Sequence, residues 1–396
     1  MNSIEIQKNV FSTGYTDWDI RDFHGYTTKR GSSYNSYLIK DDKVALIDTV
    51  KEPYANNLLR NIKERVELTK VDYVVCNHAE PDHSGALPEV LKICKNATLI
   101  CNAKCKSTLS MHYDTSSWTF EVVDEKTELS LGKNTLKFIN TPMAHWPESM
   151  FTYIPEKKLL FSMDVFGQHY ATSRPFDYKV DPEAIEELKT YYANIIMPYP
   201  TQVTKILEKV ATFDIEMIAP SHGIIWKENI SKIIQAYKDW AICKSEPKLL
   251  IFYDTMWKST AMMANAIYEG AQKSGIMIKK FDLKNTNITI ITEEIIDAAT
   301  VAVGSPTLNK ELMPKLAESL TYVRGLLPKE NNKTALAFGS YGWGKKGAQH
   351  QVHEYLKSMG CKMLFEEPIQ SQYVPTKEIL DECRKAGEKL ADIAKT

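Results

Sequence analysis

Two histidines and two acids lie within six residues, in the segment His78-Ala-Glu80-Pro-Asp82-His83. Such a group costs charge repulsion unless a cation or solvent relieves it, and imidazole and carboxylate groups are common metal ligands. Adjacent positions such as Asp82 and His83 cannot share a helix face, so an irregular loop must direct these side chains toward different targets. The segment therefore predicts two adjacent metal ions, one binding His78 and Glu80 and the other binding Asp82 and His83.

Three further candidate ligands follow strand-like runs in the same half of the chain. His145 follows TLKFINTPMA, Asp164 ends KLLFSMD, and His222 follows EMIAP. Taken singly, either histidine is more typical of an ordinary hydrogen-bonded residue at a strand end. Together with the hexapeptide, however, they form a set of seven ligands. The two carboxylate oxygens of Asp164 can bridge both metals.

Polar and aromatic residues follow three strand-like runs in the other half. Hydroxyls and free N–H groups at a helix N-terminus form an anion cradle suited to a terminal phosphate, and aromatic rings offer a stacking surface. The loops are Asp254-Thr255-Met256-Trp257-Lys258-Ser259-Thr260, Ser305-Pro306-Thr307-Leu308-Asn309 and Ser340-Tyr341-Gly342-Trp343-Gly344. Open α/β sheets bind ligands at the carboxyl ends of strands, so these loops predict a site for a phosphate-bearing aromatic ligand such as a flavin. No GxGxxG motif follows the first strand, which disfavours a dinucleotide.

The elements that must position these residues differ between the two halves. In the first half we predict strands over residues 33–39, 43–50, 71–77, 97–102, 135–142, 150–154, 158–164 and 216–223, and helices over 53–65, 182–209 and 227–243. A polar hinge, Lys244-Ser245-Glu246-Pro247, then separates domains 1–246 and 247–396. Beyond it, apolar runs at 248–255, 276–283, 300–306, 333–340 and 362–369 alternate with helix-compatible stretches. Such runs predict a five-stranded parallel sheet with helices on both faces.

Composition narrows the functional class. The chain has 396 residues, and 49 Lys and Arg balance 50 Asp and Glu, so nothing favours nucleic-acid binding. No apolar run approaches the roughly 18 residues of a membrane-spanning helix, and the first residues lack the pattern of a secretory signal. Seven scattered cysteines without a CxxC pair indicate reduced thiols and a cytoplasmic location.

The ligand set resembles that of the metallo-β-lactamase superfamily, in which HxHxDH is usual, except that Glu80 replaces the second histidine. A mixture of carboxylates and imidazoles suits redox-active iron better than it suits the zinc ion of a hydrolase. The second half resembles flavodoxin, with Trp257-Lys258 where Thr-Gly is usual. Over almost its whole length the chain resembles the flavodiiron proteins (A-type flavoproteins), which implies an αββα sandwich followed by a doubly wound flavodoxin-like sheet.

The resemblance also implies cofactors and chemistry. FMN and two iron ions per chain are expected: His78, Glu80, His145 and Asp164 would hold one iron, and Asp82, His83, Asp164 and His222 the other. In some family members the position of His83 is not a ligand, so its direct binding stays open. The family reduces O2 to water, NO to N2O, or both. A diferrous site and reduced FMN together hold the four electrons that O2 requires.

Partners and pocket residues follow from the same resemblance. We expect a head-to-tail homodimer or a dimer of dimers, and an external electron donor such as rubredoxin or a reduced deazaflavin. His24, Tyr26, His169 and either Tyr191 or Tyr192, of which we favour Tyr192, are expected to line the gas pocket. Asp48 is expected to orient a ligating histidine. Two alternatives remain: a zinc hydrolase with an attached flavin domain, and a flavodoxin-type electron carrier.

Overall fold

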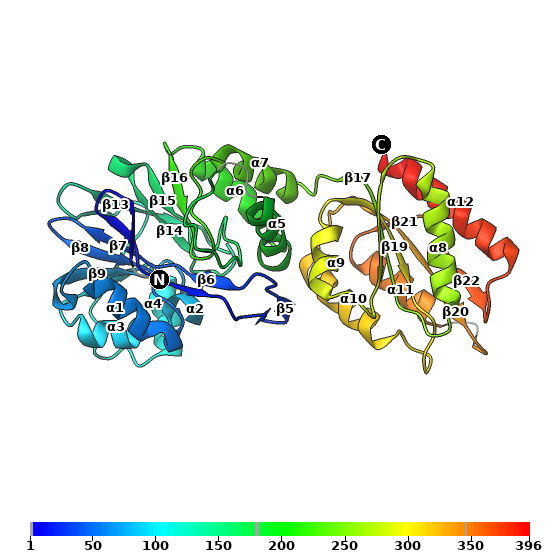
Figure 1. The fold of residues 1–396 in the computed structure, drawn as a ribbon, viewed down its shortest axis with the longest axis horizontal. Helices are drawn as coiled ribbons and strands as arrows, with labels where there is room; N and C mark the ends of the chain where they lie inside the picture. The colour runs from blue at the N-terminus through cyan, green and yellow to red at the C-terminus, as the bar shows by residue number, and fades with distance from the viewer. Residues whose placement is uncertain (1–2, 179–181, 345–346) are drawn as a thin grey trace. The chain divides into compact units, whose positions relative to one another are not determined.

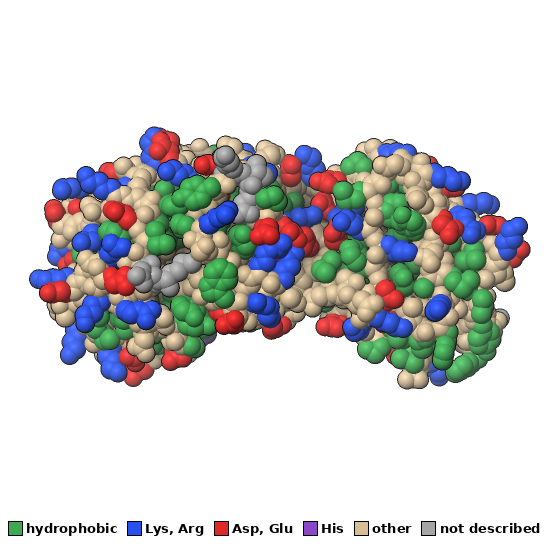
Figure 2. Space-filling view, viewed as in Figure 1, with side chains coloured by type: hydrophobic (Ala, Val, Ile, Leu, Met, Phe, Trp, Pro, Cys, Tyr) green, Lys and Arg blue, Asp and Glu red, His purple; other side chains and the backbone are tan. Residues whose placement is uncertain are grey.

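The computed structural model describes residues 3–178, 182–344 and 347–396. By its internal contacts the chain divides into two compact units, one made of the residues up to Tyr192 with Thr201–Lys238, the other of Ala193–Pro200 with Asp239–Thr396. No helix in the described ranges has the length and apolarity needed to cross a bilayer. Basic and acidic side chains are interspersed on the face shown in Figure 2.

Two sheets form the N-terminal unit. The larger has the order β1-β2-β7-β8-β9-β10-β11, and the smaller has the order β12-β13-β14-β15-β16. Their bounds are Ile4–Gln7 (β1), Val10–Ser12 (β2), Tyr37–Lys40 (β7), Val44–Ile47 (β8), Val71–Val75 (β9), Thr98–Cys101 (β10), Phe120–Val122 (β11), Glu128–Ser130 (β12), Thr135–Asn140 (β13), Met150–Ile154 (β14), Leu159–Phe161 (β15) and Met217–Ala219 (β16). Two short ribbons pair Tyr15–Asp17 (β3) with Ser32–Tyr34 (β6), and Asp22–Phe23 (β4) with Tyr26–Thr27 (β5).

A shared apolar core joins the two sheets. Val75 and Ile100 of the larger sheet belong to the same buried cluster as Phe138 and Phe161 of the smaller one. Helices lie outside the sheets (Figure 1), namely Ala55–Lys63 (α1), Leu87–Ile93 (α3), Ala103–His112 (α4), Pro182–Tyr191 (α5), Pro200–Val210 (α6) and Ile230–Ala241 (α7). The arrangement is the αββα sandwich expected from the resemblance.

The long helix predicted over residues 182–209 is interrupted. After α5 the backbone forms a π-helical segment, Tyr192–Ile196, and α6 begins only at Pro200. Proline lacks the N–H that a continuing helix needs and clashes with the preceding turn. Pro198 and Pro200 therefore divide what the periodicity presented as one helix.

The C-terminal unit is a doubly wound parallel sheet of order β18-β17-β19-β20-β21, with β22 also paired to β20. Its elements are Glu246–Tyr253 (β17), Ser259–Gln272 (α8), Met277–Asp282 (β18), Ile288–Ile295 (α9), Ala298–Gly304 (β19), Pro314–Leu326 (α10), Thr334–Tyr341 (β20), Ala348–Ser358 (α11), Lys362–Met363 (β21), Ile369–Gln372 (β22) and Lys377–Ala394 (α12). The predicted fifth strand is thus two short strands. Helices α8 and α12 pack together on one face, and α9 and α11 cover the other (Figure 1).

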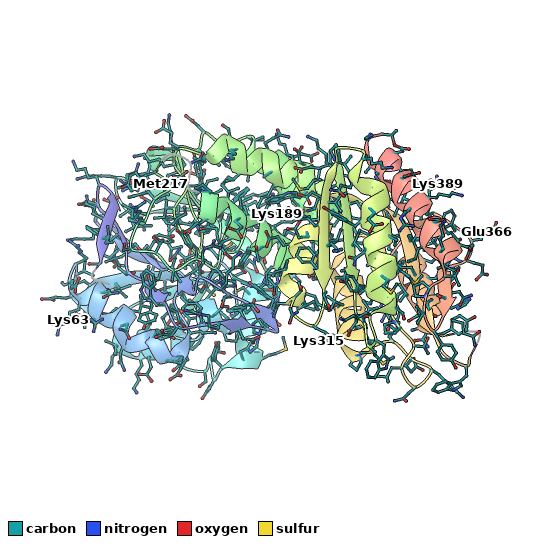
Figure 3. The ribbon with its side chains drawn as sticks, turned by 45° about the vertical axis from the view of Figure 1, so that its right-hand side comes forward. Lys63, Lys189, Met217, Lys315, Glu366 and Lys389 are labelled. Atoms are coloured by element: carbon teal, nitrogen blue, oxygen red, sulfur yellow. The ribbon has the colours of Figure 1, made fainter. Side chains whose placement is uncertain are left out.

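Helices α1 and α12 are amphipathic. Along α12, Cys383, Ala386 and Leu390 are buried in the core. Lys389 of the same helix and Lys63 at the end of α1 point outward (Figure 3). Burial of one apolar stripe per helix is the main source of stability for elements of this length.

Two glycines let α8 and α12 approach closely. A Cβ atom on Gly387 would lie 2.0 Å from the carbonyl oxygen of Ile267, and one on Gly270 would lie 1.9 Å from that of Arg384. We expect Gly387→Ala to lower the free energy of unfolding of this unit by about 1–3 kcal/mol, because the helices must separate. Urea unfolding followed by circular dichroism measures the change.

The matched control is Gly325→Ala in α10, where an added Cβ meets no atom within 4 Å. At this exposed helical position alanine should stabilise the unit by roughly 0.5–1 kcal/mol. Equal effects of the two substitutions would show that close packing of α8 and α12 contributes nothing.

Candidate metal centre and flavin cradle

The metal-centre residues lie just beyond strand ends of the N-terminal sandwich. Strands β15 and β16 pair in parallel with Phe161 opposite Ala219, so Asp164 and His222, each three residues further on, leave the sheet together. His145 lies in the loop between β13 and β14. The hexapeptide follows β9, and its second half forms the one-turn helix Pro81–Ser84 (α2), for which Glu80 is the N-cap. This turn separates the directions of the four side chains.

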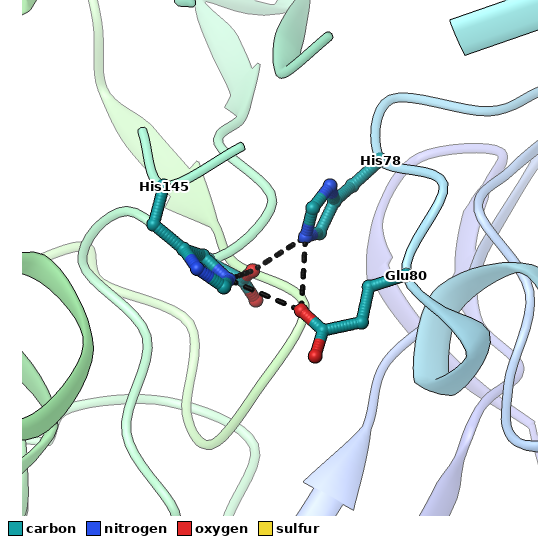
Figure 4. A group of neighbouring side chains, drawn as sticks. His78, Glu80 and His145 are labelled. Atoms are coloured by element: carbon teal, nitrogen blue, oxygen red, sulfur yellow. Dashed lines mark hydrogen bonds and ion pairs between the residues drawn. The ribbon is translucent and has the colours of Figure 1, made fainter. Parts of the chain in front are cut away.

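The first ligand group consists of His78, Glu80, His145 and Asp164, whose ligand atoms all lie within 4.8 Å of one another. Glu80 Oε2 is 3.2 Å from His78 Nε2 and 3.1 Å from His145 Nε2 (Figure 4). Asp164 Oδ2 is 3.3 Å and 3.2 Å from the same two nitrogens. Two imidazoles and two carboxylates thus converge on one point.

The second group consists of Asp82, His83 and His222. Asp82 approaches His83 Nε2 at 3.3 Å and His222 Nε2 at 3.2 Å. The other oxygen of Asp164, Oδ1, lies 3.1 Å from His83 Nε2 and 3.3 Å from His222 Nε2. Asp164 therefore presents one oxygen to each group, and the structure brings all seven predicted residues together.

The donor set fits a pair of cations. Asp82 Oδ1, Asp164 Oδ1 and His83 Nε2 are buried and lack a hydrogen bond of ordinary geometry. Buried polar atoms are costly when unsatisfied, and here they converge on the same space. Nitrogen and carboxylate oxygen ligands in this proportion suit redox-active iron.

Electrostatics in the cluster favour charged side chains. Burial alone would lower the pKa of His78, but its hydrogen bonds to Glu148 and Glu80 outweigh burial and raise that pKa to about 10. In His222, hydrogen bonds to Asp164 and Asp82 likewise overcome burial and raise the pKa to about 10. Burial opposes ionisation of Asp164, yet His83 and the other imidazoles hold its pKa well below the usual range. The buried carboxylates are therefore stabilised by positive charge nearby. Without a metal, protonated histidines provide that charge.

Two ligating candidates are oriented through their second ring nitrogen. Nδ1 of His78 lies 2.9 Å from Glu148 Oε1, and Nδ1 of His222 donates to the carbonyl oxygen of Ser33 at 2.6 Å. Such contacts fix the tautomer and orientation of a metal-binding imidazole. The sequence reasoning missed Glu148, because its partner His78 is 70 residues away and no spacing in the sequence links the two.

Asp48 does not have the role predicted for it. Its carboxylate accepts from the backbone and side-chain amides of Asn77, at 2.7 and 2.9 Å, rather than from an imidazole. Asp48 therefore fixes the turn that leads into His78, and Glu148 contacts the histidine itself.

Of the residues predicted to line the gas pocket, His24, Tyr26 and His169 lie near the ligand groups or near one another, and Tyr192 does not. The His24 side chain is 67% exposed, and its Nε2 lies 3.3 Å from Glu80 Oε1. The buried His169 ring is 4.8 Å from His222 and 5.5 Å from Tyr26. The expectation for Tyr192 is corrected. Its ring packs on Tyr237, whereas the neighbouring Tyr191 lies 5.0 Å from His169 and 5.8 Å from His222.

The three flavin loops meet at the carboxyl ends of β17, β19 and β20. Backbone hydrogen bonds join Asp254 to Gly304 and Thr307 to Ser340. Gln349, which the sequence reasoning missed, is fully buried and donates to the carbonyl oxygens of Ser305 and Ser340. The loops are thus tied into one surface.

This surface fits FMN. Thr255 Oγ1 is buried without a hydrogen-bond partner, and the hydroxyls of Ser259 and Thr260 lie in the first turn of α8. Lys258, at the position where flavodoxins usually have glycine, has a φ of +70°, which glycine adopts most easily. Trp257 and Trp343 are 90% and 92% exposed, so these indoles do not fill the core and are available for stacking.

Comparison with known proteins identifies the family. Residues 33–223 match the ODP family beta lactamase model, and residues 251–387 match the flavodoxin model. A nitric oxide reductase from Moorella thermoacetica is 43% identical over 98% of both chains, and an anaerobic nitric oxide reductase flavorubredoxin from Shigella flexneri is 37% identical over 98% of this chain and 82% of its own length. The crystal structure of the flavodiiron protein from Giardia intestinalis has a TM-score of 0.96 and 38% identity, covering 100% of this chain and 97% of that one.

The chain belongs to the flavodiiron protein family. The rubredoxin oxygen:oxidoreductase from Desulfovibrio gigas is similar as well, with a TM-score of 0.95 and 35% identity, covering 100% of this chain and 99% of that one. As a flavodiiron protein the chain is an oxidoreductase with FMN and two iron ions as its cofactors. The oxidoreductase interpretation is confirmed, and the zinc hydrolase is set aside.

Glu148 provides a test of the metal centre of this flavodiiron protein. We expect Glu148→Gln to weaken iron binding by about 10- to 100-fold, because His78 loses its charged acceptor. Iron retention against a competing chelator measures the effect. Glu89→Gln, on the exposed side of α3, is the control. Equal iron retention in the two variants would contradict the role of Glu148.

Proposed function

We propose that this flavodiiron protein reduces NO to N2O, O2 to water, or both, with electrons that pass from an external donor through FMN to the two irons. The observation that carries the proposal is the position of Asp164 between two ligand groups, one oxygen facing each. Relatives named as a nitric oxide reductase and as a rubredoxin oxygen:oxidoreductase support these substrates and favour a rubredoxin as donor.

In this proposal His78, Glu80 and His145 hold one iron, and Asp82, His83 and His222 hold the other, with Asp164 shared by both. When bound, the irons and FMN supply the electrons for two-electron reduction of NO or four-electron reduction of O2. The domains proposed to hold them are 1–246 and 247–396. FMN would occupy the three loops that begin at Thr255, Ser305 and Ser340.

The residues beside the metal groups would hold and donate protons. His169 is neutral, because burial and the nearby His222 depress its pKa well below the ordinary value. Its Nδ1 lies 2.6 Å from Ser32 Oγ, and its buried Nε2 has no hydrogen-bond partner. The Ser32 hydroxyl can donate to this Nδ1 or to the carbonyl oxygen of Ser33. When it donates to Nδ1, the ring carries its proton on Nε2, where it would donate to a bound gas. Burial and Asp164 raise the pKa of Tyr191 well above its usual value, which keeps this second donor protonated.

The proposed electron route requires flavin and iron to approach closely, for which we propose the head-to-tail homodimer, alone or as a dimer of dimers. A C2 arrangement is the commonest symmetry of protein oligomers. We also propose a cytoplasmic location, supported by seven cysteines that are all unpaired.

His145 tests the reaction. His145→Ala should abolish O2 and NO consumption and lower the iron content while FMN stays bound, because only the first ligand group is damaged. Anaerobic gas electrodes, with iron and FMN quantified in the same sample, provide the measurement. His112→Gln, an exposed histidine outside both ligand groups, should keep full turnover. Normal turnover by His145→Ala would instead favour a simple flavodoxin-type carrier.

The head-to-tail arrangement is tested by mixing two inactive variants. His145→Ala lacks a working metal centre, and Ser259→Glu places a carboxylate in the proposed phosphate cradle, where a helix N-terminus tolerates it. If each flavin serves the partner's irons, exchange of subunits at equal concentrations should restore about a quarter of the wild-type rate, because half of the dimers are mixed and each has one intact pair. No recovery after proven subunit exchange would refute the arrangement.

A further inference from the structure

A polar pocket lies in the N-terminal unit outside the metal centre. Its walls come from the first strands of the chain, from the segment that contains Ser33 and Asn35, from residues 170–175 and from Gly223. Its volume is about 50 Å3. No aspartate or glutamate lines it, and its one charged side chain is Arg174.

In the part of the chain that the structure describes, two hydroxyls and one guanidinium in this lining have hydrogen-bond donors without a partner. Ser33 Oγ accepts from the backbone N–H of Gly223 at 2.7 Å, and Thr172 Oγ1 accepts from that of Arg174 at 3.1 Å. Within the described ranges neither hydroxyl hydrogen has an acceptor, and the exposed Arg174 guanidinium has no carboxylate partner. A hydroxyl offers one donor and a guanidinium five. These unused donors suit a ligand that carries acceptor atoms.

The pocket wall is also the support of His222. The carbonyl oxygen of Ser33, a lining residue of the pocket, accepts from His222 Nδ1, while its hydroxyl oxygen accepts from the backbone N–H of Gly223. Asn35 completes the clamp, because its side-chain amide donates to the carbonyl oxygens of Pro220 and Gly223 at 2.9 and 3.0 Å. A ligand bound to Ser33 would thus contact the residue that orients a metal ligand.

We propose that this pocket binds a small oxyanion, a carboxylate or a phosphate, between Arg174 and the hydroxyls of Thr172 and Ser33. Guanidinium groups pair with both anions through charge-assisted hydrogen bonds, and the hydroxyls supply further donors. The site is distinct from the metal centre and from the FMN phosphate cradle. The pocket would be a second anion site of this chain, beside Ser33, which orients His222.

Isothermal titration calorimetry of the iron- and FMN-loaded protein tests the proposal, since bound FMN fills the phosphate cradle. The probes are inorganic phosphate and acetate at constant ionic strength, which distinguish a tetrahedral from a planar anion. We expect saturable binding of at least one probe. Arg174→Gln should weaken it at least about ten-fold, and Thr172→Val should weaken it several-fold while leaving the charge in place.

The matched control is Arg60→Gln, which removes an exposed arginine of α1 outside the pocket and should leave binding unchanged. Absence of saturable binding by either anion would overturn the proposal. So would binding that Arg174→Gln and Arg60→Gln affect equally, because the anion would then respond to net charge and not to the pocket.

Discussion

The metal centre depends on one constraint: three carboxylates and four imidazoles must share one buried volume. Asp164 is the pivot, because its two oxygens face different ligand groups at 3.1–3.3 Å. Burying these charges is expensive unless each is compensated. The αββα sandwich meets this requirement by directing chain segments from both sheets to one edge, so that compensation comes from residues distant in sequence.

In the C-terminal unit, too, segments distant in the sequence meet at one edge of a sheet, but their side chains have different chemistry. Parallel pairing of β17, β19 and β20 brings three loops to one edge of the sheet, and Gln349 links two of them. Here the side chains supply hydroxyls and exposed indoles rather than ionised ligands. The unit therefore suits a phosphate-bearing aromatic cofactor, as expected for the switch region of a doubly wound sheet.

The sequence was sufficient for what depends on residue type and order. Each metal-ligand candidate follows a strand-like run, so its place at a sheet edge could be inferred before the fold was known. The predictions that were wrong or missing concern contacts between side chains that are distant in the sequence. Tyr191 rather than Tyr192 faces His169, and nothing in the sequence relates these adjacent tyrosines to a histidine more than 20 residues away. Glu148 was missed because its contact with His78 spans 70 residues and no spacing rule reveals it.

The replacement of histidine by Glu80 in the usual HxHxDH pattern has a structural reason. Glu80 Oε2 contacts His78 and His145, while Oε1 extends to His24 in the loop between β4 and β5. A histidine at position 80 could direct one ring nitrogen at the ligand group. Its other nitrogen would then point in a different direction from Glu80 Oε1. The carboxylate thus adds negative charge to the first group and connects it to a ribbon that no metal ligand occupies. Because this connection needs two acceptor oxygens on one side chain, the departure from the hydrolase pattern couples the metal centre to the partly exposed His24.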